Sequence, residues 1–324
     1  MIILIYGATG YTGGLVVAAA RARGVPVVTG GRSGDVERRF PVDAPELHGV
    51  TAVLSCAGPF TRTAAPLARA CMAAGVHYLD LAGEVAEHEA VRALDGEAAA
   101  RGVMLMPGVG FGVVPTECAA ALAVRELPSA TKVTVAFETV GGASRGTLDT
   151  LFAALATPGF ARRGGVLVED TPAARVLDLD LGGGVVRVAS NPHRADLVSI
   201  HAATGVPDIE TYAAFPAPVR ALMRSRLRHA KIVRGAIGAL VARAPAGPSD
   251  AERARGHTRV LAIAEDGARR AEVRLRGPEA YDFTARVAVA AIERISEAKP
   301  GFQAPSQVFG PDFVSSIEGV EVVT

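Results

Sequence analysis

Three glycines near the N-terminus have the spacing of a turn that binds phosphate groups. Gly7, Gly10 and Gly13 stand three residues apart, and the short apolar run of residues 2–6 precedes them. Residues 15–24 follow, rich in the alanine and arginine that favour a helix. In such a strand, turn and helix unit, backbone N–H groups and the positive helix terminus can hold a pyrophosphate. Because glycine triplets also occur in ordinary strand-to-helix turns, the flanking elements carry the prediction.

Each glycine of this turn has a different expected role. Gly7 permits the tight turn, Gly10 lets the backbone approach the pyrophosphate, and Gly13 allows the helix to pack closely on the strand. The whole turn is expected to bind the dinucleotide. It comprises Gly7, Ala8, Thr9, Gly10, Tyr11, Thr12 and Gly13.

The residues after the second expected strand, residues 26–29, predict which dinucleotide is bound. An acid at this position accepts hydrogen bonds from the ribose 2′-OH of NAD and repels the 2′-phosphate of NADP. Here Gly30 and Gly31 leave room for a phosphate instead. Arg32 can pair with that phosphate, and Ser33 can donate a hydroxyl hydrogen bond. The sequence therefore predicts NADP(H), with an exposed loop arginine as the alternative.

Apolar runs and helical segments continue to alternate, as in a doubly wound parallel sheet. Ligands of such a sheet lie outside the carboxyl ends of the strands. The turns that follow the strands are therefore expected to line the cofactor site. The further expected strands are 40–42, 51–56, 76–81 and 103–106, and the expected helices are 63–74, 86–101 and 115–127.

Three of these turns contain glycine and are expected to line the crevice. Glycine and proline also punctuate loops that bind nothing, so the prediction depends on their shared position after strands. The middle turn is Ala82, Gly83 and Glu84. The residues assigned to the cofactor in the other two turns are Ser55, Cys56, Ala57, Gly58, Pro59 and Phe60, with Gly108 and Phe111.

Hydride transfer to a C=N or C=O bond also requires a proton donor within hydrogen-bond reach. The candidates are Tyr78, Asp80 and Glu84, around the end of the 76–81 strand. Tyr78 and Asp80 share one face of that strand, and the alternative for them is a buried hydrogen-bonded pair. Glu84 stands at a crevice turn and is expected to contact the nicotinamide ribose or the substrate.

The second half of the chain changes to strands bounded by turns, which predicts an antiparallel sheet packed against helices. A hairpin over residues 259–277 and an amphipathic helix over 281–299 follow. His201 and Tyr212 are further candidates for the chemistry, and the alternative for His201 is an ordinary core or surface histidine. The expected strands are 131–140, 174–181, 185–190, 195–204 and 209–215.

Residues 219–243 predict one long helix with an apolar stripe and a basic face. The basic face is either a solvated surface or a dock for an anionic partner such as a phosphopantetheine arm, a carrier protein or a lipid surface. This leaves an alternative function: a non-catalytic scaffold with a nucleotide fold that docks a partner or membrane through residues 220–231. The cations of the basic face are Arg220, Arg224, Arg228 and Lys231.

Several stretches of residues 1–125 resemble the saccharopine dehydrogenase-like family of NADP-binding oxidoreductases, which includes saccharopine reductases and trans-acting enoyl reductases. The resemblance implies an NADPH-dependent reductase of a C=N, C=C or C=O bond in a small or carrier-bound substrate. The stretches are YGATGYTGG, GGRS, SCAGPF, CMAAGVHYLDLAGE and MPGVGFGVVPTECAA.

The fold class that follows is α/β, with a Rossmann-type parallel sheet domain and a second α+β domain whose sheet is mostly antiparallel. The length of 324 residues suits two domains. We expect an NADP-binding domain at 1–127, a substrate and dimerisation domain at 128–280, and a C-terminal helix and tail at 281–324 that packs back on the first domain. The strands of 174–215 offer faces that predict a homodimer.

Composition narrows the remaining possibilities. A net charge of +1 with mixed signs gives no reason to expect nucleic acid as a partner. No apolar run approaches the length of a membrane span, and no residue cluster has the spacing of a metal site. The three cysteines, Cys56, Cys71 and Cys118, are too few and too scattered for a disulfide framework, which favours the cytoplasm.

Overall fold

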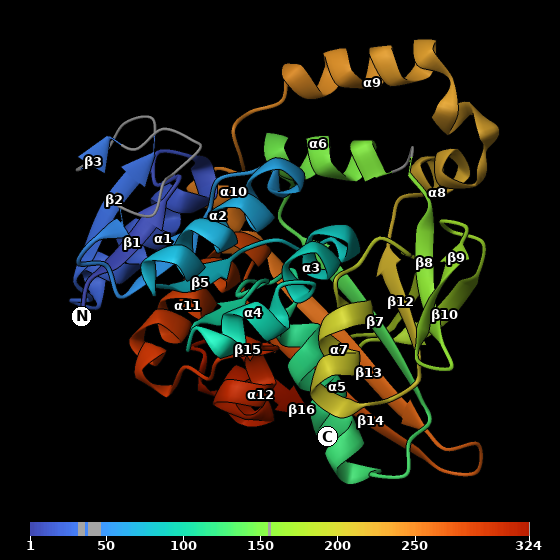
Figure 1. The fold of residues 1–324 in the computed structure, drawn as a ribbon. Helices are drawn as coiled ribbons and strands as arrows, with labels where there is room; N and C mark the ends of the chain where they lie inside the picture. The colour runs from blue at the N-terminus through green and yellow to red at the C-terminus, as the bar shows by residue number, and fades with distance from the viewer. Residues whose placement is uncertain (32–35, 38–46, 155–156, 324) are drawn as a thin grey trace. The chain divides into compact units, whose positions relative to one another are not determined.

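The computed structural model describes residues 1–31, 36–37, 47–154 and 157–323. The chain forms two compact units (Figure 1): the first contains Met1–Cys118 and Tyr281–Glu318, and the second contains Ala119–Ala280 and Gly319–Thr324. Arg32, Ser33 and the strand expected at 40–42 lie outside the described residues. Among the helices of the described ranges, none has the length and apolarity needed to cross a membrane.

The sheet of the first unit is parallel throughout, as the sequence predicts. Its strand order is β15-β6-β5-β4-β1-β2-β3. From β1 the chain adds β2 and β3 on one side and then β4, β5, β6 and β15 on the other, so the order of the strands reverses between β1 and β4. Dinucleotides bind at this kind of reversal in a Rossmann fold. The strands are β1 (Ile3–Tyr6), β2 (Val27–Gly31), β3 (Val36–Glu37), β4 (Ala52–Ser55), β5 (His77–Asp80), β6 (Met104–Met106) and β15 (Gly301–Phe302).

The helix expected over 86–101 is divided into two, which corrects the prediction. Leu94, with φ −95° and ψ 1°, leaves the helical conformation and is buried. The bend also lets the Asp95 carboxylate accept a 2.7 Å hydrogen bond from the backbone N–H of Phe302. The helices of this unit are α1 (Tyr11–Ala22), α2 (Phe60–Ala74), α3 (Val85–Arg92), α4 (Asp95–Ala100), α5 (Val114–Glu126), α11 (Ala280–Glu293) and α12 (Pro305–Phe309), with 3-10 turns at Ile295–Glu297 and Pro311–Ser316; α5 and α11 cross the unit boundaries.

The second unit has a mostly antiparallel sheet, which confirms the expected fold class. Only the pair β12 and β7 is parallel among the strand pairs of the described chain in this sheet. The β8–β9 hairpin has no counterpart in the sequence-based prediction. The strands are β7 (Lys132–Val140), β8 (Gly159–Arg163), β9 (Val166–Asp170), β10 (Val176–Asp180), β11 (Val185–Ser190), β12 (Asp208–Ala214), β13 (His257–Glu265), β14 (Arg270–Gly277) and β16 (Glu321–Val323).

The strand expected at 195–204 is wrong, because these residues form helix α7 (Asp196–Thr204). Its first five residues, from Asp196 to Ile200, are all buried, so the segment lacks the alternating exposure of a half-buried strand. Gly205, at φ 73°, provides the left-handed residue that ends the helix.

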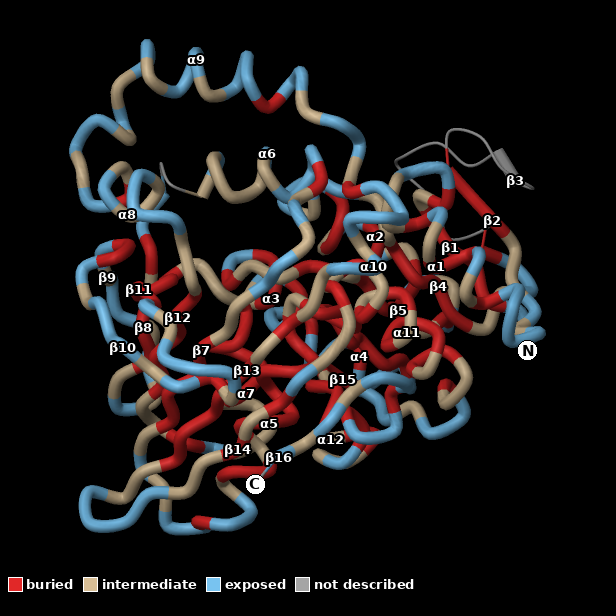
Figure 2. Tube along the Cα trace, turned by 180° about the vertical axis from the view of Figure 1, so that it is seen from behind, coloured by how far each residue is buried: buried red, intermediate tan, exposed pale blue. Residues whose placement is uncertain are grey.

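The long helix expected over 219–243 is also wrong as a single element. It is divided into α8 (Ala217–Arg224), a 3-10 turn (Arg226–His229) and α9 (Lys231–Ala242), and extended residues Ser225 and Ala230 separate the pieces. The Ser225 hydroxyl accepts the N–H of Leu227 and stabilises the first break. α9 is largely exposed (Figure 2) and runs beside α6 (Arg145–Ala154), while α10 (Asp250–Arg255) follows it in the chain.

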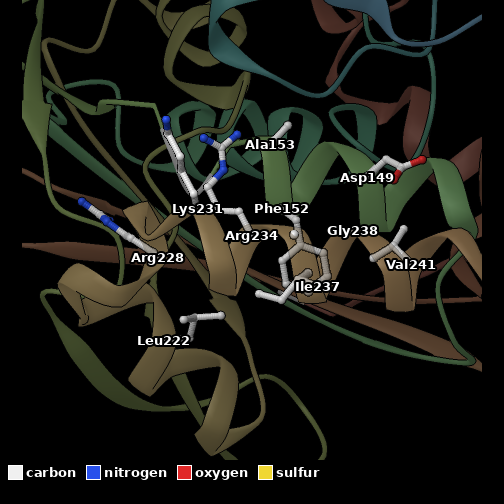
Figure 3. A pocket seen from close by; sticks show the side chains of 11 residues that line it. Asp149, Phe152, Ala153, Leu222, Arg228, Lys231, Arg234, Ile237, Gly238 and Val241 are labelled. Carbon is white, nitrogen blue, oxygen red and sulfur yellow. The ribbon is translucent and has the colours of Figure 1, made fainter.

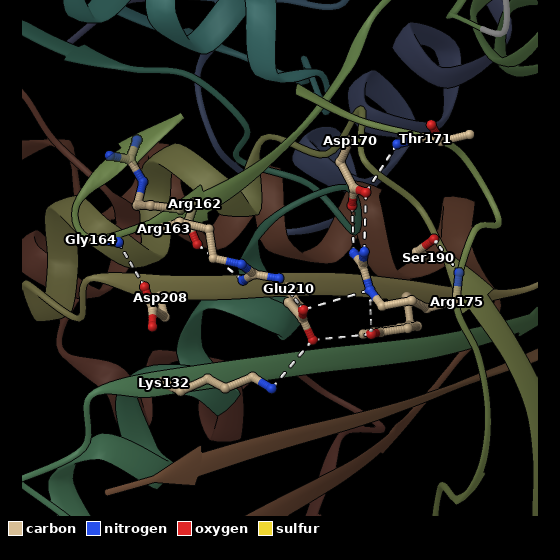
Figure 4. Close-up of polar contacts among 11 residues, drawn as sticks. Lys132, Arg162, Arg163, Gly164, Asp170, Thr171, Arg175, Ser190, Asp208 and Glu210 are labelled. Atoms are coloured by element: carbon tan, nitrogen blue, oxygen red, sulfur yellow. Dashed lines mark hydrogen bonds and ion pairs between the residues drawn. The ribbon is translucent and has the colours of Figure 1, made fainter. Parts of the chain in front are cut away.

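A cluster of charged side chains around the buried Glu210 connects β8 to the centre of this sheet (Figure 4). Glu210 on β12 is 8% exposed and forms ion pairs with Lys132 at 3.4 Å, with Arg163, and with Arg175 at 3.6 Å. The hydroxyl of buried Tyr212 donates a 3.0 Å hydrogen bond to the same carboxylate. Burial raises the pKa of Glu210, but the three cations and this hydrogen bond outweigh it and hold the pKa below its ordinary value.

We predict that Glu210→Gln lowers the free energy of unfolding by about 2 kcal/mol at neutral pH, because it leaves three cations without their shared anion. Since folding depresses the pKa of Glu210, its contribution is complete above the ordinary carboxyl pKa and is lost as the pH falls through the folded value. The difference between wild type and Glu210→Gln in the free energy of unfolding, measured by urea denaturation, should therefore become smaller at acidic pH.

The matched control is Asp178→Asn, which removes an ion pair with Arg187 whose two side chains are 50% and 59% exposed. Exposed pairs of this kind contribute little to stability, because solvent and salt screen them. Equal losses in the two variants would show that the Glu210 cluster does not stabilise the sheet more than a surface pair does.

Candidate functional site

Four turns follow strands of the parallel sheet: Gly7 to Gly13 after β1, Ser55 to Phe60 at the end of β4, Ala82 to Glu84 after β5, and the turn with Gly108 and Phe111 after β6. The first of these turns lies against the second at the β1/β4 reversal. Gly7 has φ +83°, and a Cβ atom added to it would lie 2.9 Å from both the backbone nitrogen and the Cβ atom of Ala57. The N–H of Gly7 donates a 2.8 Å hydrogen bond to the carbonyl of Gly30 at the end of β2. Only glycine fits at position 7, because both the backbone conformation and the space exclude a side chain.

The start of α1 offers its backbone N–H groups to an anion. A Cβ atom at Gly13 would lie 2.3 Å from the carbonyl oxygen of Gly7, so the helix packs directly on the turn. Gly10 is the N-cap, no side chain caps the helix, and its first turn contains no acid. The helix terminus is therefore positive and open, as a pyrophosphate site requires.

The second turn holds a buried hydroxyl group. Ser55 ends β4 and is 0% exposed, and within the described chain its Oγ has no hydrogen-bond partner. The turn is held in place by the Thr63 hydroxyl, which donates to the Ala57 carbonyl at 2.8 Å. Burial raises the pKa of the neighbouring Cys56 to about 12, so its thiol stays protonated and is not a nucleophile.

Tyr78 and Asp80 form a buried pair at the end of β5. Both are 0% exposed, and the tyrosine hydroxyl donates to Oδ2 of Asp80 at 2.6 Å. Oδ1 of Asp80 accepts the N–H groups of Ala82 at 2.8 Å and of Gly108 at 2.9 Å. One carboxyl group thus fixes the third and fourth turns, which supports the structural alternative for this pair over proton transfer to a substrate.

Burial and hydrogen bonding shift the pKa of Asp80 in opposite directions. Burial raises the pKa of Asp80 to about 6, while the hydrogen bonds from Tyr78, Gly108 and Ala82 lower it. The pKa of Tyr78 is raised well above its ordinary value by burial and then by the Asp80 charge. The tyrosine therefore remains a neutral donor at physiological pH.

The fourth turn packs against α11, which comes from the far end of the sequence. The N–H of Phe111 donates to the hydroxyl of Thr284 at 3.1 Å, and the rings of Phe111 and Phe283 lie 5.7 Å apart. Tyr11 in the first turn makes an edge-on contact with Tyr281 at 5.1 Å. No local sequence pattern points to these three residues of α11, because they lie 170 or more residues from their partners along the chain.

The third turn brings two acids together. Glu84, half-buried at the N-terminus of α3, accepts the N–H of Gly83 at 2.9 Å. Glu87 is 5% exposed, and burial, followed by the charge of Glu84, raises its pKa to about 7. The sequence-based analysis missed Glu87, since a glutamate in the first turn of a charged helix has a common structural explanation.

The second unit places its two sequence-based candidates differently. His201 lies in α7, where its Nδ1 is 2.9 Å from the carbonyl oxygen of Val206. Tyr212 belongs to the Glu210 cluster. Arg32 and Ser33, the residues expected at the 2′-phosphate, fall outside the described ranges, and Gly30 and Gly31 before them end β2.

Comparison with known proteins matches the first unit to an NADP-binding domain. Residues 35–106 match the family model described as the saccharopine dehydrogenase NADP binding domain. A Mycobacterium tuberculosis protein assigned as a trans-acting enoyl reductase is 31% identical over 139 residues, which cover 36% of this chain and 33% of that protein. A trans-acting enoyl reductase of Mycobacterium bovis is 27% identical with the same coverage. The chain therefore spans about a third of the length of these relatives.

The fold of the whole chain is that of a solved dehydrogenase. The apo saccharopine dehydrogenase (L-Glu forming) of Saccharomyces cerevisiae superimposes with a TM-score of 0.60 over 100% of both chains, at 10% sequence identity. At that identity the likeness concerns the fold alone. The match confirms the expected resemblance to the NADP-binding domain of saccharopine dehydrogenases, and with it NADP(H) as the cofactor class of the matched domain.

We predict that Asp80→Asn is tolerated and that Asp80→Ala is not. The amide oxygen of asparagine can still accept the N–H groups of Ala82 and Gly108, whereas alanine leaves these buried donors and the Tyr78 hydroxyl without a partner, at a cost of about 3 kcal/mol. Urea denaturation with NADPH titration of each variant measures both effects.

The difference in stability between wild type and Asp80→Asn should depend on pH. Because folding raises the pKa of Asp80, its contribution is complete below the ordinary carboxyl pKa and is lost as the pH rises through about 6. Wild type should therefore lose stability relative to Asp80→Asn between about pH 4 and about pH 6, with little further change at higher pH. A constant difference, or an asparagine variant as unstable as the alanine variant, would contradict this role.

Proposed function

We propose that this chain, whose residues 35–106 match an NADP-binding domain of saccharopine dehydrogenases, is an NADPH-dependent reductase of a C=N, C=C or C=O bond in a small or carrier-bound substrate. The observation that supports it most directly is the edge of the sheet at the β1/β4 reversal. There the Gly7 turn and the start of α1, which no side chain caps, occur together with the Ser55 hydroxyl, which has no hydrogen-bond partner among the described residues. These features fit a dinucleotide, which supplies an anionic pyrophosphate and further hydrogen-bonding groups.

Each part of the cofactor has residues suited to hold it. The turn from Gly7 to Gly13 and the first N–H groups of α1 suit the pyrophosphate, and Arg32 with Ser33 suits the 2′-phosphate. The segment from Ser55 to Phe60, together with Gly108 and Phe111, is left for the nicotinamide half. NADPH supplies the hydride to the substrate.

The proton chemistry is assigned to the third turn. Glu84 contacts the ribose or the substrate, and Glu87 beside it has a pKa near 7, which suits a group that gives and takes protons. Tyr78 and Asp80 hold the turns in position. The similarity to trans-acting enoyl reductases favours a carrier-bound substrate with a C=C bond.

The free thiols of Cys56, Cys71 and Cys118 support the cytoplasm as the compartment.

We also propose a homodimer formed through the second unit. β10 is an edge strand with exposed Val176 and Leu177, and Val185 on the neighbouring β11 is 72% exposed. Unpaired edges with apolar side chains tend to pair with another chain.

We predict that wild type has about twice the mass of the 33.3 kDa chain in light scattering and that Val185→Asp reduces it to one chain, because a carboxylate at an apolar interface is desolvated without a partner. Val323→Asp, at a 50% exposed valine on β16, is the control and should leave the mass unchanged. A monomeric wild type would contradict the proposal.

We predict that Arg32→Ala weakens NADPH binding roughly ten- to a hundredfold and leaves NADH binding nearly unchanged, because it removes a charged hydrogen bond to the 2′-phosphate. Calorimetric titration of both cofactors into both proteins measures the effect. The control is Arg69→Ala, which removes an exposed arginine of α2 and should not alter either affinity.

Equal losses for the two cofactors, or a wild type that prefers NADH, would show that Arg32 does not contact the phosphate. A wild type that binds neither cofactor would overturn the proposed function itself.

If Glu84 acts on the substrate, Glu84→Gln should lower kcat/KM more than it weakens the NADPH affinity.

A further inference from the structure

Positive charge is concentrated in residues 216–243 of the second unit, which we call the basic segment. The segment comprises α8, the 3-10 turn and α9, and its sequence contains seven lysines and arginines and no aspartate or glutamate. The whole chain has a net charge of only +1, so the segment differs sharply from the remainder. The cations are Arg220, Arg224, Arg226, Arg228, Lys231, Arg234 and Arg243.

α9 exposes apolar side chains on the face that lies opposite its cations. Ile232 is 88% exposed and Leu240 is 70% exposed, and the exposed Ala236 between them completes a stripe at helical spacing. Leu227, in the preceding turn, is 59% exposed. A helix that faces only water carries polar residues on its outer face, so this stripe indicates a non-aqueous neighbour.

The inner face of α9 and α6 line an open amphipathic groove of about 450 Å³ (Figure 3). Arg228, Lys231 and Arg234 lie at one end of it, while Phe152 and Ile237 lie farther along. Within the described part of the chain, Lys231 and Arg234 make no ion pair with a carboxylate. The cations are therefore available to an external anion whose apolar part extends beside them.

Charge and chemistry distinguish between the possible occupants of this surface. A second copy of the chain would place seven cations against seven, which repels. An acidic protein would satisfy the cations, but the stripe of Ile232, Ala236 and Leu240 offers its backbone and polar groups no hydrogen-bond partner. Anionic phospholipids satisfy both requirements, because phosphate groups lie directly above acyl chains.

We propose that the basic segment binds the surface of an anionic phospholipid bilayer. Ile232, Leu240 and Leu227 enter the boundary between head groups and acyl chains, and the cations at both ends of α9 pair with lipid phosphates. The helix lies in the plane of the surface, as interfacial helices with one apolar face do. The inference does not depend on the proposed reductase activity.

The test is co-sedimentation of the full chain with vesicles of phosphatidylcholine alone and of phosphatidylcholine mixed with phosphatidylserine. Binding to the mixed vesicles should be strong at low salt and weaken as salt rises, and binding to the neutral vesicles should be weak. The charge-reversed double variant Lys231→Glu, Arg234→Glu should lose about tenfold or more of the affinity. The apolar double variant Ile232→Asp, Leu240→Asp should lose binding at every salt concentration.

Two controls make the result specific. Arg62→Glu, Arg69→Glu makes the same charge change at exposed positions of α2 and should bind vesicles like wild type. The variants of the basic segment change exposed residues, so they should keep the unfolding midpoint and the NADPH affinity of wild type. A failure of NADPH binding in wild type is therefore a separate result from a failure of vesicle binding.

Equal binding to both kinds of vesicle, or no loss in either basic-segment variant, would overturn the proposal. Polyglutamate provides the remaining comparison. If the chain binds polyglutamate and neither kind of vesicle, the surface serves an acidic polypeptide and the lipid proposal is wrong.

Discussion

Gly7, Gly13 and Ala57 bring three backbone segments into contact at the β1/β4 reversal, closer than side chains permit. A Cβ atom at Gly13 would overlap the Gly7 carbonyl at 2.3 Å, and one at Gly7 would press on Ala57 at 2.9 Å. This approach sets where α1 begins, and therefore where the N–H groups of its first turn point. The binding edge of the sheet follows from it, because the helix terminus can act on an anion only from that short distance.

A second constraint is the hydrogen bonding of Asp80, which holds the turns that follow β5 and β6. Asp80 is fully buried, yet its carboxyl group accepts hydrogen bonds from Tyr78, Ala82 and Gly108. These three donors support a positioning role for Asp80. Acid–base work is therefore better suited to the neighbouring turn, where Glu84 is half-buried and the pKa of Glu87 is near 7.

The sequence predicts the parts of this edge that depend on neighbours along the chain. Strand β1, the glycine turn and α1 are local, and glycine spacing specifies them. The support from Thr284 depends on a contact over 173 residues, which no local pattern encodes. α7 misled the analysis because its consecutive apolar residues suit a buried helix as well as a strand. The family resemblance supplied the cofactor class, whereas the hydrogen bonds of Asp80 support a positioning role for it.

The second unit shows why available charge, rather than charge itself, locates a surface for an external anion. Lys132, Arg163 and Arg175 lie in or next to its sheet, but each forms an ion pair with Glu210, and Arg175 also pairs with Asp170. An incoming anion would have to displace a carboxylate that is already desolvated and hydrogen-bonded. Lys231 and Arg234 present no such competitor among the described residues. The basic segment is therefore the part of this unit best suited to attract a phosphate group, and the exposed apolar side chains of Ile232 and Leu240 on the other face of α9 add an apolar component.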